Sequence, residues 1–329
     1  MHRAAPLRSA ALTTRPELPP CGILLLDKPR GLSSNAALQR VRWLFGRPKA
    51  GHTGSLDPLA TGMLPVCIGE ATKLAGALLA ERKSYEFDLR LGARTDTGDA
   101  EGSVVATAPV PPLAEPAVRA LLATLVGPQQ QVPPMYSALK QGGQPLYKLA
   151  RQGIEVAREP RAVQLYALEL LSLEPALLRV RVECSKGTYV RVLAEDLARA
   201  LGTLGHLVAL RRLAVEPFGQ EPMHTLEALE AATDRLALLL PADRAVPQLA
   251  AARFDGPGLH ARRHGQPARP QRVELDAALP PGAMLRLYGP DGAFLGLGEA
   301  QPDGLVPPRR LLACVRAPLA AARRRGPAR

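Results

Sequence analysis

The sequence predicts an α+β protein, with a mixed, largely antiparallel sheet flanked by helices and a small β-barrel domain near the C-terminal end. Three observations support this fold class. Segments such as 83–91 and 177–185 alternate apolar and polar residues, which is typical of half-buried strands. Helical patterns lie between such segments, and this mixture favours a largely antiparallel sheet. Beyond residue 245 the chain becomes short apolar runs separated by Gly and Pro, as in small β-barrels.

Regular structure is expected to begin at Cys21, where GILLLD (22–27) is typical of a buried strand. The next polar stretch leads into a helix capped by Ser33 or Ser34, because a serine hydroxyl can accept from the free amides at a helix start. The elements expected up to residue 126 are, in order, the strand at 22–27, this helix, a strand at 63–69, a helix at 70–80, the alternating strand at 83–91, a loop at 94–102 and a helix at 115–126.

The strands resume after residue 161 and continue the same mixture. SKGT (185–188) is expected to turn the chain into a helix whose apolar stripe is Leu193, Leu197 and Leu201. The elements expected in this part are strands at 162–174 and 177–185, the helix after SKGT, a strand at 207–215 and a short helix near 225–232.

Residues 127–161 differ from their surroundings, because prolines, glycines and basic residues alternate there with Met135, Tyr136 and Tyr147. We interpret this stretch as an excursion from the core with its own helix at 144–152. Basic residues among aromatic ones suit contact with nucleic acid, where rings stack on bases and cations meet phosphates. The charge pattern alone favours a solvated helical hairpin.

Composition narrows the class of protein. A chain of 329 residues suits two domains, or one large domain with an appendage, and 47% hydrophobic residues exclude a disordered protein. The net charge of +12 indicates a polyanionic partner. No apolar run reaches the roughly 20 residues needed to cross a bilayer, so no membrane contact is expected.

The cysteines and the ends of the chain indicate a cytoplasmic protein. Cys21, Cys67, Cys184 and Cys314 form no CxxC pair and have no nearby histidine, which argues against structural zinc and a disulfide framework. Reduced thiols are therefore expected. Residues 1–20 lack the apolar core of a secretory signal, and both they and the basic stretch 317–329 are expected to be disordered tails.

The segment GHTGSLDPLATG (51–62) contains a single carboxylate, Asp57, which a turn or a helix cap would explain. The loop lacks the Gly-Lys-Ser/Thr ending of a nucleotide P-loop, which argues against an enzyme that binds phosphate there. The chain has no GxSxG motif and no histidine pair with metal-ligand spacing. Neither a metal nor a cofactor is expected, which leaves an Asp, a His, several tyrosines and a basic surface.

The segment GHTGSLDPLATGMLPVCIGEATK (51–73) resembles the signature motif of the TruB family of bacterial tRNA pseudouridine-55 synthases. Five further segments resemble that family in the same order: LDKPRGLSSN (26–35), LGARTDTGDAEG (91–102), VPPMYSALKQGGQPLYKLARQGIEV (132–156), CSKGTYVRVLAEDLA (184–198) and LRRLAVEPF (210–218). The resemblance covers residues 22 to 316. It implies a catalytic domain of the pseudouridine synthase fold at 21–248, an RNA-gripping thumb at 127–161 and a PUA-like RNA-binding domain at 249–316.

The resemblance also implies a reaction, the isomerisation of uridine to pseudouridine at position 55 in the T-loop of tRNA. The base flips out, its N1–C1′ bond breaks, the base rotates, and a C5–C1′ bond forms. Asp57 would attack the ribose or abstract a sugar proton to give a glycal, and both routes remain open. Since no water adds and nothing is oxidised, the reaction requires no metal or redox cofactor, and no second acid is expected.

The family assigns roles to further residues. Burial alone would raise the pKa of Asp57, so a cation is needed beside it, and by resemblance that cation is Arg191. Tyr85 would stack on the flipped uracil and help remove the C5 proton, although strand patterning alone makes it a core aromatic. Tyr189 would line the same pocket, whereas its local pattern equally suits packing on a sheet.

Three other residues match the family pattern. His52 would fill the space in the RNA that the flipped base vacates. Leu210 would contact the substrate nucleotide, or else is simply a leucine of the core. Lys28 would approach the site or support the Asp57 loop.

The expected partner is the T-arm of tRNA, with no obligate protein partner and a monomeric state. The second hypothesis is a protein that binds or folds RNA on the same scaffold without catalysis. The joint presence of Asp57, Arg191, Tyr85 and Tyr189 argues against it, because a protein that only binds RNA does not need a charged pocket floor.

Overall fold

The computed structural model describes residues 19–76, 78, 82–255, 257, 266–274 and 280–313. The tails expected at 1–20 and 317–329 lie outside these residues, apart from residues 19 and 20. Within the described part of the chain, no helix has both the length and the apolar character required to cross a membrane.

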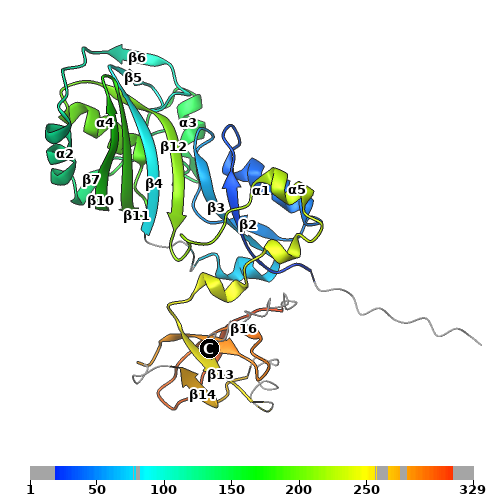
Figure 1. The fold of residues 1–329 in the computed structure, drawn as a ribbon. Coiled ribbons are helices and arrows are strands. Elements are labelled where there is room, and N and C mark those ends of the chain that lie inside the picture. Colours follow the sequence, from blue (N-terminus) through cyan, green and yellow to red (C-terminus); the bar gives the residue numbers. More distant parts are fainter. Residues whose placement is uncertain are drawn as a thin grey trace, which may run out of the picture.

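One large sheet of eight strands dominates the structure (Figure 1). Its order is β1-β3-β12-β4-β11-β10-β7, and β2 pairs with β3 outside this path. Neighbours are antiparallel except β3 and β12, which run parallel, so the predicted mixed, largely antiparallel sheet is confirmed. The strands are β1 (Gly22–Lys28), β2 (Ala50–His52), β3 (Thr61–Ile68), β4 (Arg82–Leu91), β7 (Gly127–Gln131), β10 (Arg161–Glu174), β11 (Leu177–Ser185) and β12 (Gly205–Val215).

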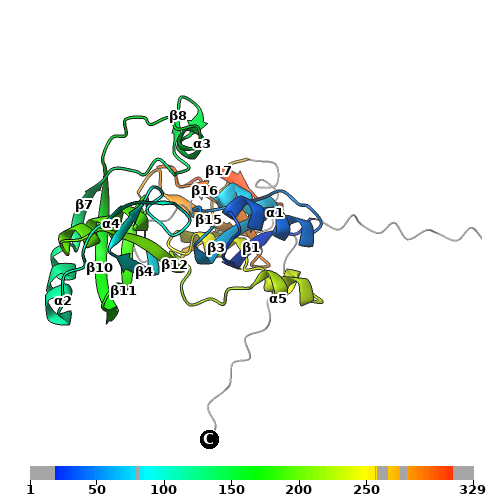
Figure 2. The ribbon, with the colours of Figure 1, turned by 90° about the horizontal axis from the view of Figure 1, so that it is seen from above.

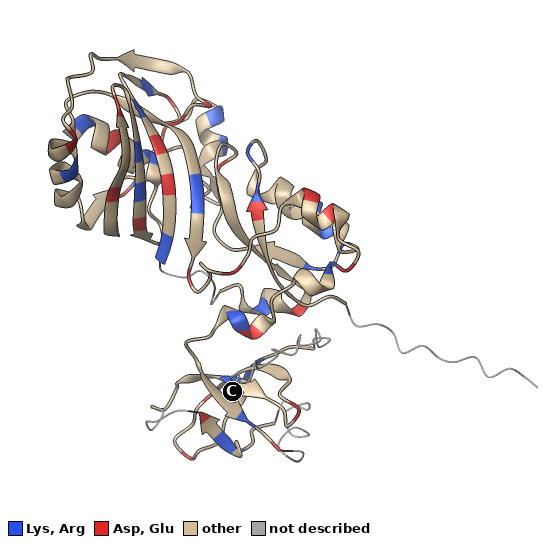
Figure 3. Cartoon of the chain, in the orientation of Figure 1, with Lys and Arg blue, Asp and Glu red and all other residues tan. Residues whose placement is uncertain are grey.

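The alternation in β4 decides which face of this sheet is covered. Tyr85, Phe87 and Leu89 are buried in one core with side chains of α2 (Glu115–Thr124) and α4 (Val190–Ala200). Charged residues occur at intervals along these strands (Figure 3), and on the face opposite the core they form the ion pairs Arg179–Asp88 and Arg181–Glu86, both at 2.7 Å. The apolar and polar faces therefore follow the period of two that a strand imposes.

The first helix, α1 (Ser34–Leu44), covers β1 and β3 together with α5 (Leu226–Ala231). Its N-cap is Ser33, whose hydroxyl accepts from the backbone amide of Ala36 at 3.1 Å. Ser34 instead lies inside the helix, buried against the loop that precedes β3.

Residues 132–160, here called the thumb segment, leave the sheet between β7 and β10. They form a hairpin of β8 (Lys140–Gln141) and β9 (Gln144–Pro145), followed by α3 (Leu146–Arg151). Figure 2 shows this unit projecting from the sheet on the side where α4 lies. The excursion expected at 127–161 begins later than predicted, because Gly127–Gln131 pairs with β10 as an edge strand, where a proline is tolerated.

A second sheet of five strands forms the small C-terminal domain, in the order β14-β13-β15-β16-β17. Leu297 and Leu312 of this domain pack in the same apolar cluster as Ile23 and Met63 of the large sheet. Two hydrogen bonds reinforce the contact, from Tyr288 to Asp243 and from Lys73 to the carbonyl of Leu311, both at 2.8 Å. The strands are β13 (Ala250–Arg253), β14 (Arg272–Glu274), β15 (Met284–Tyr288), β16 (Phe294–Glu299) and β17 (Pro308–Leu311).

Several local expectations were wrong. The region after β3 is a 3₁₀ helix, η1 (Gly69–Leu74), and part of the helix expected at 70–80 lies outside the described residues. The loop at 94–102 opens with a strand, β5 (Ala93–Thr95), which pairs with β6 (Val104–Thr107). Cys67 and Cys184 are free, whereas Cys21 is disulfide-bonded, so the expectation of reduced thiols was wrong for Cys21. Two further 3₁₀ helices are η2 (Leu236–Leu238) and η3 (Ala242–Ala245).

Candidate active site

The loop between β2 and β3 carries Asp57 and is held from two sides. The Ser34 hydroxyl donates to the carbonyl of Leu56 at 2.9 Å and accepts from its amide at 2.7 Å. The ammonium group of Lys28, which is fully buried, donates to the carbonyls of Leu32 at 2.6 Å and Pro58 at 3.4 Å. Both residues fix the backbone on either side of Asp57, so Lys28 supports this loop.

Gly62 allows the loop to enter β3 close against β12. Its φ is +96°, and a Cβ atom at this position would lie 2.2 Å from the carbonyl oxygen of Arg212. Gly62 and Arg212 are also partners in the parallel pairing of β3 and β12. The packing therefore requires a glycine at position 62, since any side chain there would push β3 and β12 apart.

Asp57 and Arg191 form an ion pair, with Arg191 Nε 2.9 Å from Asp57 Oδ2. Arg191 lies near the start of α4 and is almost fully buried. Its other two nitrogens donate to the carbonyls of Thr97 at 3.0 Å and Tyr136 at 2.7 Å. All three guanidinium nitrogens are thus engaged with different segments, which fixes the group in one orientation under the carboxylate.

A second carboxylate, Asp99, lies near the same guanidinium, although the sequence led us to expect no second acid. Its Oδ2 is 3.8 Å from Arg191 Nε, and its Oδ1 accepts from the Thr97 hydroxyl at 2.7 Å. Asp99 is buried, whereas 41% of the Asp57 side chain is exposed. The polar stretch TDTGD (95–99) was the only signal for this residue in the sequence.

Burial and two neighbouring charges decide the direction in which the pKa of Asp57 shifts. Its burial raises the pKa above the usual aspartate value, Arg191 lowers it, and Asp99 raises it again. The positive charge of Arg191 therefore opposes the effect of desolvation on the pKa, while the exposed part of Asp57 remains open to a substrate.

Tyr85 and Leu210 lie in neighbouring strands beneath this loop. Both are buried, in the same apolar cluster as Leu56 and Leu59 of the loop. Burial raises the pKa of the Tyr85 hydroxyl, and the positive charge of Arg212, its partner across β4 and β12, lowers it. The structure thus places both side chains in the core next to Asp57, so they form the wall on the sheet side of the site.

Tyr189 is the N-cap residue of α4 and is half-buried. The side chain of Gln131 holds its backbone at two points, accepting from the Tyr189 amide at 2.9 Å and donating to its carbonyl at 3.4 Å. Burial raises the pKa of the Tyr189 hydroxyl. Gln131, the last residue of β7 before the thumb segment, thus positions a residue of the site, and no pattern in the sequence indicates this role.

His52 ends β2 and is half-buried. Its Nδ1 has no hydrogen-bond partner. Burial and the charge of Arg212 both lower the pKa of its imidazole, which favours the neutral ring near pH 7. The described residues include no group of three His, Cys, Asp or Glu side chains that could hold a metal ion.

Three protein-family models match this chain, and together they extend from residue 42 to residue 312 with a gap at 248–261. Residues 42–190 match the TruB family pseudouridylate synthase N-terminal domain, and residues 191–247 match the tRNA pseudouridylate synthase B C-terminal domain. Residues 262–312 match a further model, described as pseudouridine synthase II TruB, C-terminal.

Individual relatives agree with these matches. The chain is 51% identical to tRNA pseudouridine synthase B of Aromatoleum aromaticum, over 89% of this chain and 93% of that protein. It is 50% identical to the protein of the same name from Dechloromonas aromatica, over 88% and 95%. Among solved structures, one chain in the crystal structure of a Cbf5-Nop10-Gar1 complex is similar, with a TM-score of 0.63, 25% identity, and coverage of 85% of this chain and 78% of that one.

Proposed function

The chain belongs to the TruB family of pseudouridylate synthases, isomerases that convert uridine to pseudouridine in tRNA, and on this basis we propose that its target is uridine 55 in the T-loop. The observation that carries this proposal is the contact between Arg191 Nε and Asp57 Oδ2 at 2.9 Å. It provides an oriented and partly exposed carboxylate, paired with a fixed cation, in the loop that resembles the family signature.

Asp57 is the catalytic residue of the proposed reaction. In one route its carboxylate attacks C1′ of the ribose, the N1–C1′ bond breaks, and the bonding electrons leave with the uracil. In the other it takes a proton from the sugar as the same bond breaks, which gives a glycal. When C5 of the rotated uracil bonds to C1′, the Asp57–C1′ bond breaks in the first route, and the sugar proton is returned in the second. C5 then loses its proton, and N1 takes one up. Atoms are conserved throughout, as an isomerisation requires.

The walls of the site suit a flipped nucleotide. The uridine must leave its stack to reach Asp57, and base-flipping enzymes hold such bases between aromatic and apolar side chains. Tyr85 would stack on the uracil and its hydroxyl would receive the C5 proton. Tyr189 would contact the nucleotide from the start of α4 and Leu210 from β12, and His52, neutral near pH 7, would fill the gap left in the RNA.

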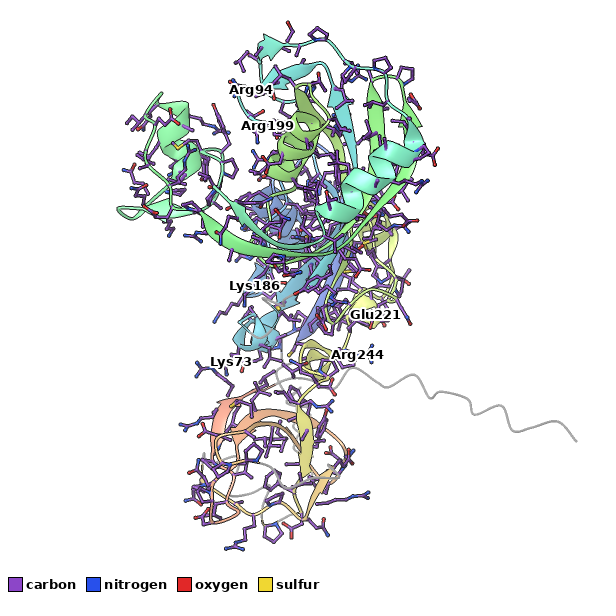
Figure 4. All side chains as sticks on the ribbon, turned by 90° about the vertical axis from the view of Figure 1, so that its left-hand side faces the viewer. Lys73, Arg94, Lys186, Arg199, Glu221 and Arg244 are labelled. Carbon is purple, nitrogen blue, oxygen red and sulfur yellow. The ribbon has the colours of Figure 1, made fainter. Side chains whose placement is uncertain are left out.

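Two parts outside the catalytic loop would grip the RNA. The thumb segment (132–160) contributes Tyr136, whose carbonyl accepts from Arg191, so this segment adjoins the catalytic pair. Figure 4 shows Lys186 and Lys73 on the side of the molecule where the thumb segment projects, above the C-terminal sheet. The separate five-stranded sheet supports a division into a catalytic domain at 21–248 and an RNA-binding domain at 249–316, with phosphate contacts supplying affinity.

The test is tritium release from a tRNA transcript labelled at uridine C5, because C5 loses its hydrogen only when the new bond forms. The wild-type protein is expected to release tritium from a transcript with uridine at position 55 and not from one with cytidine there. Tight tRNA binding without any release would contradict the proposal and favour the hypothesis of an RNA-folding protein.

A further inference from the structure

A cluster of positive charge without a carboxylate partner lies beside the catalytic loop. Its buried member is Arg212, which is 0% exposed. Arg212 Nε donates to the carbonyl of Met63 at 2.6 Å, and its Nη2 donates to the carbonyl of Gly54 at 2.9 Å. Its Nη1 is buried without any hydrogen-bond partner. The guanidinium also interacts with the hydroxyl of Tyr85, its cross-strand partner, so its positive charge lies directly beside the ring that is proposed to stack on the uracil.

The second member is Lys83, on the same strand face as Tyr85 and two residues before it. It is half-buried, and its desolvation together with the charge of Arg212 lowers its pKa. Lys186 and the thiol of Cys184 are the other titratable groups that act on it. In the described part of the chain, no carboxylate lies within ion-pair distance of Lys83 or of Arg212. Two cations thus share a site without an anion between them.

Both cations converge on Gly54. A Cβ atom on Gly54 would lie 3.4 Å from Arg212 Nη1 and 3.5 Å from Lys83 Nζ. The φ of Gly54 is +72°, so this position also disfavours any other residue. The missing side chain leaves the two nitrogens facing the same space beside the loop.

Unpaired polar atoms concentrate at the same place. Five buried side-chain polar atoms of the described residues have no partner, and three of them belong to His52, Thr53 and Arg212. His52 and Thr53 directly precede Gly54 in the loop. Such a concentration of unused donors and positive charge suits a ligand with several anionic oxygens.

We propose that Lys83, with Arg212 beneath it, binds a backbone phosphate that flanks the flipped uridine. This inference rests on the proposed function, since it assigns a contact to the RNA in that same site. Two residues along a strand span about 7 Å, which is close to the reach from a nucleobase to the phosphate of its own nucleotide. With Tyr85 under the uracil, Lys83 would hold the backbone in place while the detached base rotates.

The experiment combines a protein variant with a modified RNA. T-arm stem-loops are prepared with the phosphate on the 5′ or on the 3′ side of the target uridine replaced by an uncharged methylphosphonate. Their affinities for the Asp57→Asn protein, which leaves the RNA unconverted, are compared with those for the Asp57→Asn, Lys83→Met double variant. We expect Lys83→Met to weaken binding of the unmodified RNA about tenfold, and to lower the salt dependence by the equivalent of about one phosphate contact.

The decisive outcome is the coupling of the two changes. One of the two methylphosphonate RNAs should bind about tenfold more weakly to the Asp57→Asn protein, with no further loss upon Lys83→Met, because both changes remove the same contact. Equal additional losses with both RNAs would overturn the proposal. Arg181→Ala is the control, since it removes one positive charge from the opposite face of the sheet and should leave binding unchanged.

Two further measurements separate the causes of failure. The methylphosphonate RNAs test the contact with Lys83 intact, so unaltered affinity for both would overturn the proposal even if the Lys83→Met protein were unstable. Tritium release by the wild-type protein reports on the function independently. Release together with no coupling at Lys83 would overturn this phosphate site and leave the proposed function standing, whereas no release would count against both.

Discussion

Arg191 reaches Asp57 with Nε while its other two nitrogens are bound to the backbone of two separate segments, at Thr97 and Tyr136. The guanidinium therefore cannot turn towards Asp57 or away from it without losing another hydrogen bond. The orientation of the proposed catalytic carboxylate depends on this fixed fork.

Replacing the guanidinium of Arg191 should slow the reaction without preventing the binding of tRNA. An Arg191→Lys protein keeps the charge, but its single nitrogen cannot reach Asp57 and both carbonyls together. We expect the rate of conversion at saturating enzyme to fall about a hundredfold, with tRNA affinity within a few-fold of wild type. Single-turnover tritium release and filter binding measure the two quantities. Arg179→Lys, on the polar face of the sheet, is the matched control, and an equal loss there would contradict this assignment.

Asp99 should control the pH dependence through Asp57. Its negative charge raises the pKa of Asp57, so an Asp99→Asn protein should hold Asp57 ionised to lower pH. The proposed reaction needs the ionised form, and the acidic limb of the kcat/KM profile should therefore move to lower pH. The profile is measured by tritium release across acidic buffers. A limb that stays in place or moves to higher pH would show that Asp57 does not set it.

Gly62 should be essential for stability. Gly62→Ala places a Cβ atom 2.2 Å from the carbonyl oxygen of Arg212, at a φ of +96° that disfavours L side chains. We expect the free energy of unfolding to fall by about 2–3 kcal/mol or more, as measured by urea denaturation. Gly51→Ala is the control in the same loop region, since no atom lies within 4 Å of its Cβ position. Similar stabilities of the two variants would refute the argument from close approach.

Tyr85→Phe separates the ring from the hydroxyl. The ring can still stack on the uracil, so tRNA affinity should stay near wild type. If the hydroxyl receives the C5 proton, conversion should slow about a hundredfold and acquire a kinetic isotope effect when C5 carries deuterium. Conversion at the wild-type rate would assign proton removal to another group and leave Tyr85 as a stacking residue only.

Local patterns predicted much of the fold and one side of the site. The alternation in 83–91 is visible without any other information, and it placed Tyr85 on the buried face where the structure has it. The strand Gly127–Gln131 has no such alternation, and it exists only because β10 offers it an edge to pair with. The alternation of apolar and polar residues predicts which face of a strand is buried. It does not predict a strand that forms only by pairing with the edge of an existing sheet.

The parts of the site that were missed depend on distant segments. Asp99 lies next to Arg191, although 92 positions separate them, and Gln131 meets Tyr189 across the junction of the thumb segment and α4. The burial of Arg212 could have been predicted from the sequence. Arg212 is two positions from Leu210 in one strand, so both side chains share the inward face. An arginine on the core-facing side of a predicted strand is the signal that marks this residue.

The apolar cluster shared by the large sheet and the C-terminal sheet has a mechanical consequence. A hinge needs an interface that can separate at a small cost in free energy. Here, separation would expose the buried side chains of Leu297 and Leu312 and those of Ile23 and Met63, which they contact in one apolar cluster. The C-terminal sheet is therefore held in one orientation relative to the large sheet. A nucleic acid bound to this sheet would therefore meet Asp57 at a distance and in an orientation that the protein fixes.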